Sequence, residues 1–167
     1  MPEPTLYVSN DKFIFMASEG VLKDDKVRPN VLRPLLSAFH RSLPLIASCG
    51  FPMIIDHVIE RREWMDEIAE ALKDHAVYFV KVDCPVEELE RREKARGDRR
   101  VGLARWQSGL VHTFCEYDEV VDTGSCGVAE NVEKLKRLFF SENPPAALAS
   151  YRMRTSVLRR SGSDRNL

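Results

Sequence analysis

Four acidic residues of this chain stand at or just behind the ends of short apolar runs: Asp11, Asp56, Asp83 and Asp122. If those runs are parallel strands, the acids lie at the carboxyl edge of a sheet, where such sheets bind ligands. A carboxylate there can act as a general base, or hold a magnesium ion directly or through water. The alternative is that each acid caps the turn or helix after its strand, the role we favour for Asp83 and Asp122.

A second group of candidate residues is the arginine-rich run ERREKARGDRRVGLAR at 90–105, interrupted by Gly97-Asp98. Arginines in a mobile helix–loop–helix suit a transferring phosphoryl group, because they stay charged and offer forked donors to its oxygens. The alternative is a solvated helix with Glu–Arg pairs at helical spacing. The basic residues of the run are Arg91, Arg92, Lys94, Arg96, Arg99, Arg100 and Arg105.

Strands and helices that could position these residues alternate along the chain. Apolar runs predict strands at residues 6–10, 52–56, 77–82 and 119–122. Apolar residues at helical spacing predict helices at 29–49, 64–75, 85–94, 101–111 and 131–140. The alternation predicts an α/β fold, a parallel sheet with flanking helices on both faces. Pro44 is expected to kink or break the helix at 29–49, whereas Pro34 falls in its first turns and is tolerated.

Composition and charge exclude several classes of protein. The chain has 167 residues, a one-domain length, and its 25 Lys and Arg nearly balance 26 Asp and Glu. This balance excludes a nucleic-acid binder driven by bulk charge. No apolar run is long enough to span a membrane, and no signal peptide is visible. The four cysteines lack C-x-x-C or metal-ligand spacing, which predicts reduced thiols in a cytoplasmic protein.

The C-terminal segment differs in charge from the rest of the chain. From Pro145 onward, five arginines face one aspartate, a net charge of +4. We therefore expect a domain at residues 1–143 and a basic tail at 144–167 that is partly disordered or a short amphipathic helix. A solvated tail is the favoured interpretation, and binding to an anionic partner or surface is the alternative.

Several residues recur in the order and spacing of a known family. They are Arg92-Glu93-Lys94-Ala95-Arg96-Gly97-Asp98-Arg99, then Gly102, Ala104, Gln107, Val111-His112, Tyr117-Asp118 and Val121-Asp122-Thr123. This series resembles the C-terminal half of the chloramphenicol phosphotransferase-like family, and the resemblance extends over about residues 2–140. It implies a P-loop kinase-like three-layer architecture. It also implies a small kinase that phosphorylates a hydroxyl of a small molecule with ATP and Mg²⁺.

The resemblance also implies roles for individual residues. Asp11 resembles the family's catalytic aspartate, the base that takes the proton from the substrate hydroxyl. Arg96 and Arg99 resemble the lid arginines that bind phosphate oxygens and stabilise the transferring group. Ile54-Ile55-Asp56 resembles the Walker-B-like strand, which places Asp56 near the magnesium ion. His57 stands where relatives tend to have a second acid, and we interpret it as a helix-entry or pocket-lining side chain.

One expected motif is absent from the 167 residues. None of the eight glycines begins a G-x-x-x-x-G-K-[ST] loop, whose backbone amides and lysine hold ATP phosphates. We therefore expect the chain to lack the family's first βα unit and to be inactive in phosphotransfer by itself. The missing strand lies in mid-sheet in such kinases, so two neighbouring strands are expected to lose a hydrogen-bonding partner.

Two other interpretations of function remain open. The chain could be a non-catalytic remnant or interaction module of the same fold, an interpretation motivated by the missing loop and the basic tail. It could also be another small-molecule or nucleotide kinase, with an acceptor pocket built after Asp11 from Phe13, Phe15 and Met16.

Overall fold

The computed structural model describes residues 4–97, 101–114 and 116–163, with side chains described as far as residue 157. Arg99 and Cys115 lie outside the described residues. The chain divides into two compact units, Met1–Leu72 and Lys73–Leu167. Each unit is described by itself.

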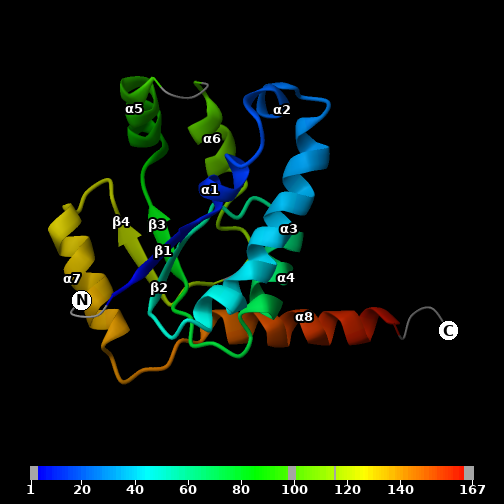
Figure 1. The fold of residues 1–167 in the computed structure, drawn as a ribbon. Coiled ribbons are helices and arrows are strands. Elements are labelled where there is room, and N and C mark those ends of the chain that lie inside the picture. The colour runs from blue at the N-terminus through cyan, green and yellow to red at the C-terminus, as the bar shows by residue number, and fades with distance from the viewer. Residues whose placement is uncertain (1–3, 98–100, 115, 164–167) are drawn as a thin grey trace. The chain divides into compact units, whose positions relative to one another are not determined.

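The first unit is a two-stranded parallel sheet with four helices. Its elements are β1 (Leu6–Ser9), α1 (Asn10–Ile14), α2 (Glu19–Lys23), α3 (Arg28–Ala47), β2 (Met53–Asp56) and α4 (Arg62–Ala71). Leu6 lies opposite Met53, and the register continues to Ser9 opposite Asp56. In Figure 1, β1 and β2 run side by side in the same direction. The connection between them contains α3, as a parallel pair requires.

The core of the first unit lies where α3 packs against α4. Leu36, Phe39 and Leu43 follow one another at helical spacing along α3 and are fully or almost fully buried. Their counterparts on α4 and just after it include Met65, Ile68 and Leu72, also buried. This i, i+3, i+7 pattern puts an apolar stripe on one face of each helix, and burying the two stripes together stabilises the unit.

The second unit repeats the parallel pairing with other elements. These are β3 (Val80–Asp83), α5 (Val86–Arg96), α6 (Leu103–Ser108), β4 (Glu119–Asp122), α7 (Val128–Phe139) and α8 (Ala147–Ser163). Val80 lies opposite Glu119, and Asp83 lies opposite Asp122. Helix α5 ends at Gly97, whose φ of 63° is in the left-handed region that glycine adopts without strain.

The α/β class and the parallel pairing of the strands confirm the prediction from the sequence. The strands form two separate two-stranded sheets, β1 with β2 and β3 with β4, among the residues described. The expected break at Pro44 is wrong, because α3 continues through Pro34 and Pro44 to Ala47. Pro44 lies in the last turn, so the missing N–H costs the helix a single bond close to its end.

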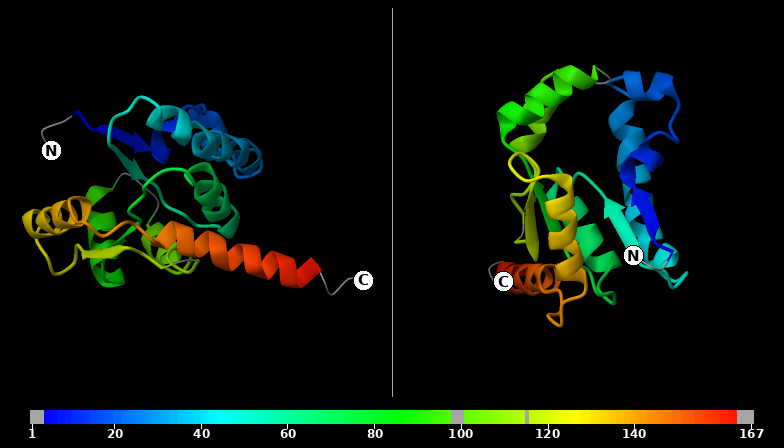
Figure 2. Two further views of the ribbon diagram at one scale, coloured as in Figure 1. Left: turned by 90° about the horizontal axis from the view of Figure 1, so that it is seen from below. Right: turned by 90° about the vertical axis from the view of Figure 1, so that its left-hand side faces the viewer.

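The basic C-terminal segment contains helix α8. Ala147, Leu148 and Tyr151 in the first turns of α8 are buried. The Asp118 carboxylate accepts hydrogen bonds from the backbone N–H groups of Ala146 and Ala147, at 2.7 and 3.0 Å. Figure 2 shows α8 as one long helix whose far end extends beyond the other elements of its unit. Its first turns are therefore an integral part of the second unit.

Within the described parts of the chain, none of the helices combines the length and the apolar character needed to cross a membrane.

Candidate functional site

Asp11 and Asp56, two of the four acids singled out from the sequence, lie at one edge of the first sheet. Asp56 is the last residue of β2 and pairs in register with Ser9, the last residue of β1. Asp11 follows two residues later, in the first turn of α1. Both carboxylates are exposed. The carboxyl ends of β1 and β2 thus bring Asp11 and Asp56 to the same edge, as the sequence pattern predicted.

Asp56 is held by a tyrosine that sequence reasoning missed. The Tyr7 hydroxyl donates a hydrogen bond of 2.6 Å to Asp56 Oδ2. Tyr7 lies opposite Ile54, two residues before Asp56, so both side chains point to the same face of the sheet. The hydrogen bond to the Asp56 carboxylate raises the pKa of the phenol. A strand register combined with period-two alternation is the signal that could have identified Tyr7.

Asp56 is the carboxylate at this edge that could hold a magnesium ion, with the other ligands supplied by water or phosphates. Among the described residues, no group of three or more His, Cys, Asp or Glu side chains could hold a metal ion. Mg²⁺, however, commonly binds one or two carboxylates and takes its remaining ligands from water and substrate phosphates. Of the hydrogen-bond donors described, only Tyr7 contacts the Asp56 carboxylate, through Oδ2. Oδ1 of Asp56 therefore remains available as a ligand.

A partly buried chain of hydrogen bonds, which we call the histidine relay, links Glu67, His40 and His57, the residue after Asp56. His40 Nδ1 lies 2.6 Å from Glu67 Oε2, and His40 Nε2 lies 2.8 Å from His57 Nε2. Desolvation lowers the pKa of His57 to about 3 and also lowers that of His40. His57 is partly exposed, and its connection to His40 and Glu67 was not predicted.

The acids at the carboxyl edge of the second sheet have structural partners. Asp122 Oδ1 accepts hydrogen bonds from the backbone N–H groups of Gly124 and Ser125, at 2.7 and 3.1 Å, and Oδ2 accepts one from the Ser125 hydroxyl. These bonds lower the pKa of Asp122. Asp83 forms an ion pair of 3.2 Å with Lys81. The turn-capping alternative is therefore confirmed for Asp122.

Part of the arginine-rich run is held by glutamates of α5. Arg91 and Arg92 both bind Glu88, at 2.6 and 2.7 Å, and this pairing lowers the pKa of Glu88 to about 2. Arg105 binds Glu90 through two hydrogen bonds of 2.6 and 3.1 Å, joining α6 to α5. Glu–Arg pairs at helical spacing, the alternative weighed for this run, are thus present for Arg91 and Arg92.

Glu93 has a different function from the other charged residues of α5. It is buried, with 4% of its surface exposed, and accepts hydrogen bonds from the N–H groups of Gly102 and Ala104 at 2.6 and 2.9 Å. It therefore fixes the start of α6 against α5. Arg96 is exposed in the last turn of α5, beside Gly97. The prediction for Arg99 falls outside the described residues.

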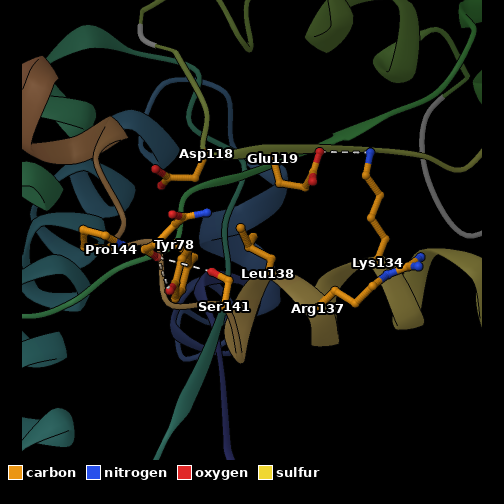
Figure 3. A pocket seen from close by; sticks show the side chains of 9 residues that line it. Tyr78, Asp118, Glu119, Lys134, Arg137, Leu138, Ser141 and Pro144 are labelled. Carbon is orange, nitrogen blue, oxygen red and sulfur yellow. Dashed lines mark hydrogen bonds and ion pairs between the residues drawn. The ribbon is translucent and has the colours of Figure 1, made fainter.

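A pocket of about 540 Å³ lies at the opposite edge of the second sheet, before the strands begin (Figure 3). It is lined by Tyr78, Asp118, Glu119, Lys134, Arg137, Leu138, Ser141, Asn143 and Pro144. Several of its polar groups already have partners: Lys134 binds Glu119 at 2.9 Å, and the Tyr78 hydroxyl donates to the Asn143 carbonyl at 2.8 Å. The pocket contains none of the site residues predicted from the sequence.

The chain is similar to a known protein family and to two curated proteins. Residues 1–139 match the family described as "Chloramphenicol phosphotransferase-like protein". Two curated relatives, from two strains of Mycobacterium tuberculosis, are each named "Putative O-phosphotransferase" and are 31% identical over 115 residues. The matched segment is 69% of this chain and 51% of each relative, so the chain spans about half the length of the curated relatives it matches.

A solved structure also shows similarity to the chain. The tunicamycin resistance protein of Deinococcus radiodurans is 16% identical, with a TM-score of 0.48, over 84% of this chain and 85% of the other. The family match covers most of the chain and includes the edge that carries Asp11 and Asp56 as well as helices α5 and α6. The chain therefore belongs to the chloramphenicol phosphotransferase-like protein family.

Proposed function

We propose that this chain is part of an ATP-dependent phosphotransferase that phosphorylates a hydroxyl group of a small molecule. The observation that carries the proposal is the register of β1 and β2, which brings Asp11 and Asp56 to one carboxyl edge within the region of the family match. A base and a magnesium-binding carboxylate at that edge are two groups that phosphoryl transfer from a nucleotide requires.

Asp11 is proposed as the general base. Its carboxylate is exposed in the first turn of α1, so the hydroxyl of an acceptor can reach it. As the acceptor oxygen bonds to the γ-phosphorus, the bond from that phosphorus to the β–γ bridging oxygen of ATP breaks. Asp11 takes the hydroxyl proton and later releases it to water, and ADP leaves with the bridging oxygen.

Asp56 is proposed to hold Mg²⁺, through Oδ1 or through a water molecule. Bound Mg²⁺ neutralises charge on the phosphate oxygens. Tyr7 fixes the orientation of the Asp56 carboxylate by its hydrogen bond to Oδ2. Tyr7 is therefore a positioning residue. Its removal should weaken the affinity of the site for Mg²⁺ and leave the base, Asp11, in place.

Arg96 and Arg99 are proposed to bind phosphate oxygens of the nucleotide. Arg96 is exposed at the end of α5, next to Gly97. A guanidinium stays charged at any physiological pH and can donate two parallel hydrogen bonds to a phosphate.

The phosphate-binding loop is proposed to come from outside these 167 residues, since no G-x-x-x-x-G-K-[ST] motif occurs within them. The chain by itself is then expected to bind Mg²⁺-ATP only weakly and to transfer no phosphate. We also propose that it works in the cytoplasm, in keeping with the unbridged thiols of Cys49, Cys84 and Cys126.

The test compares the 167-residue chain with a longer chain that includes the codons upstream of Met1. Calorimetric titration with Mg²⁺-ATP should give micromolar binding only for the longer chain, and labelled phosphate should pass to chloramphenicol or another hydroxylated acceptor. Asp11→Asn should abolish transfer, whereas Asp25→Asn, at an exposed acid of the turn between α2 and α3, should leave it unchanged. Tight binding by the 167-residue chain, or undiminished turnover of Asp11→Asn, would contradict the proposal.

A further inference from the structure

The pocket shown in Figure 3 lies away from the residues proposed for phosphotransfer. All its lining residues belong to the second unit, at the end of the sheet where β3 and β4 begin. Asp83 and Asp122 are the last residues of those strands, so the carboxyl edge is at the other end. The pocket volume of about 540 Å³ lies within the range of small-molecule sites, roughly 300–1,000 Å³. The pocket is therefore large enough for a small ligand that the proposed reaction does not use.

Hydrogen bonds hold one wall of the pocket, the segment at 141–144, in place. The Asn143 carbonyl accepts hydrogen bonds from the Tyr78 hydroxyl at 2.8 Å and from the Ser141 hydroxyl at 3.3 Å. The Asp118 carboxylate accepts one from a backbone N–H just before β3, at 2.7 Å, and two from the start of α8, at 2.7 and 3.0 Å. A ligand therefore meets a wall that is already ordered, which lowers the entropic cost of binding.

The acidic side chains that line the pocket already have partners. The Asp118 carboxylate binds the three backbone N–H groups just described. Glu119 forms an ion pair of 2.9 Å with Lys134, drawn as a dashed line in Figure 3. Lys134 also donates a hydrogen bond of 2.6 Å to the Val120 carbonyl. These contacts compensate the charges of both carboxylates and of Lys134.

Arg137 is the remaining charged side chain of the pocket lining. Within the parts of the chain that the structure describes, its guanidinium forms no hydrogen bond or ion pair. Glu133, one helical turn earlier on α7, forms its ion pair with Lys136, at 2.7 Å. The charge left without a partner at this pocket is therefore positive. A guanidinium can donate two parallel hydrogen bonds to a carboxylate or a phosphate.

The surroundings of Arg137 favour a carboxylate with an apolar body over a phosphate. Arg137 lies in the last turn of α7, where the backbone carbonyls carry partial negative charge, and two carboxylates line the same pocket. These groups repel a dianion more strongly than a single delocalised charge. The Tyr78 ring, Leu138 and Pro144 give the pocket apolar surface. In Figure 3, Leu138 lies between Tyr78 and the ion pair of Glu119.

We propose that this pocket binds a small organic carboxylate with a flat apolar body. Arg137 binds the carboxylate through two parallel hydrogen bonds, and the apolar body packs against the Tyr78 ring and Leu138. Burial of that body adds a hydrophobic contribution, which an ion pair at an exposed arginine does not supply by itself. This is a second site, and it does not depend on the proposed phosphotransfer.

Three probes of one shape test the charge preference of the pocket. Benzoate is negative, benzamide is neutral and benzamidine is positive. Titration of the ¹⁵N-labelled 167-residue chain with benzoate should shift the backbone amide signals of residues 134–143 in a saturable way. Benzamide should bind at least about tenfold more weakly, and benzamidine should give no saturable shift there. Equal binding of benzamide, tighter binding of benzamidine or no saturable shift with benzoate would overturn the proposal.

Inorganic phosphate tests whether the pocket accepts any anion. An equal concentration of phosphate should leave the shifts caused by benzoate unchanged, because phosphate has no apolar body and carries more charge. Displacement of benzoate by phosphate would overturn the assignment to an organic carboxylate.

Substitutions test the role of Arg137, which is exposed and can be replaced without opening the core. Arg137→Gln should weaken benzoate binding about tenfold, and Arg137→Lys should restore only part of the loss, because the forked donors are missing. Lys136→Gln is the matched control: it removes the same charge from the next position of α7, outside the pocket lining, and should bind benzoate as wild type does. Equal losses in Arg137→Gln and Lys136→Gln, or no loss in either, would refute the role of Arg137. None of these readouts depends on phosphotransfer, so the two proposals fail separately.

Discussion

Tyr7 and Asp56 are joined across β1 and β2 by a hydrogen bond of 2.6 Å, although 49 positions separate them in the chain. The bond forms because the parallel register places Tyr7 opposite Ile54, and Asp56 is the next residue of β2 on the same face. A charged acceptor strengthens the bond, whereas the exposure of Tyr7, at 54%, weakens it through competition with water. The net contribution of the bond to stability should therefore be small and favourable.

A double-mutant cycle with Tyr7→Phe and Asp56→Asn measures this contact. Urea unfolding of the four proteins should give a small favourable coupling energy between the two side chains. The control cycle replaces Tyr7→Phe by Tyr78→Phe, whose hydroxyl donates to a backbone carbonyl in the second unit. That cycle should be additive. A coupling energy of zero between Tyr7 and Asp56 would show that the hydrogen bond does not persist in solution.

Gly124 cannot carry a side chain in its present position. A Cβ atom built there would lie 2.3 Å from Cδ of Pro85 and 3.2 Å from Asp122 Oδ1. Gly124→Ala should therefore displace the loop after β4 and lower the free energy of unfolding by about 1–3 kcal/mol. Gly109→Ala is the matched control, because its Cβ would make an ordinary contact of 3.6 Å. Equal midpoints of denaturant unfolding for the two variants would contradict the prediction.

Glu93 is expected to matter for stability far more than its charged neighbours on α5. Glu93→Ala leaves the N–H groups of Gly102 and Ala104 without their acceptor and should cost about 1–3 kcal/mol. Glu93→Gln keeps one acceptor oxygen and should cost less. Glu87→Ala, at an exposed position of the same helix, should stay within about 0.5 kcal/mol of wild type. Thermal or urea unfolding checks all three, and a neutral Glu93→Ala variant would exclude the capping role.

The buried imidazole of His40 should make stability depend on pH near neutrality. Desolvation lowers its pKa below the usual 6.5, and the charged or titratable groups around it are Glu67 on α4, Arg41 on α3 and His57 after β2. Below pH 6.5 the unfolded chain binds a proton that folded His40 does not. The contribution of His40 to stability is therefore constant above about pH 6.5 and falls below it, by at most about 1.4 kcal/mol per pH unit, and His57, with its pKa lowered to about 3, adds a second fall of the same sign.

Urea midpoints at pH 7.5 and 5.5 test this dependence. His40→Gln should lose less stability than wild type between the two values, because the titrating group is gone. His75→Gln, at an exposed position, should keep the wild-type dependence. If His40→Gln instead retains the full pH dependence, the acid sensitivity arises from other groups.

The strands and most helices could be predicted from the local sequence, because the apolar residues of each segment follow either a continuous run or helical spacing. The run at 52–56 has no helical alternative and becomes β2. Pro44 was misjudged because a proline in the last turn removes only one bond near the end of a helix, and α3 ends three residues later at Ala47. The edge position of Asp11 and Asp56 followed from parallel pairing alone, which the alternation of elements already implied.

Contacts between helices could not be predicted in the same way. His40 lies 27 residues from Glu67 and 17 from His57, and their contacts depend on how α3 packs against α4. In the sequence, Glu93 resembles every other acid of the charged run. Only the structure shows that the start of α6 donates backbone hydrogen bonds to it. Such residues look like solvent-exposed charges in a sequence, because nothing in their local spacing reports burial.

The carboxylate of Asp118 has a consequence for how this chain can be shortened. It binds the backbone of Phe79 next to β3 through one oxygen and the first turn of α8 through the other. The family match ends at residue 139, so trimming the chain there would remove one of the two segments that this side chain joins. The segment that folds cooperatively therefore extends beyond residue 139, where the family match ends. The backbone amide protons of β3 and of the start of α8 should show similar protection from hydrogen exchange.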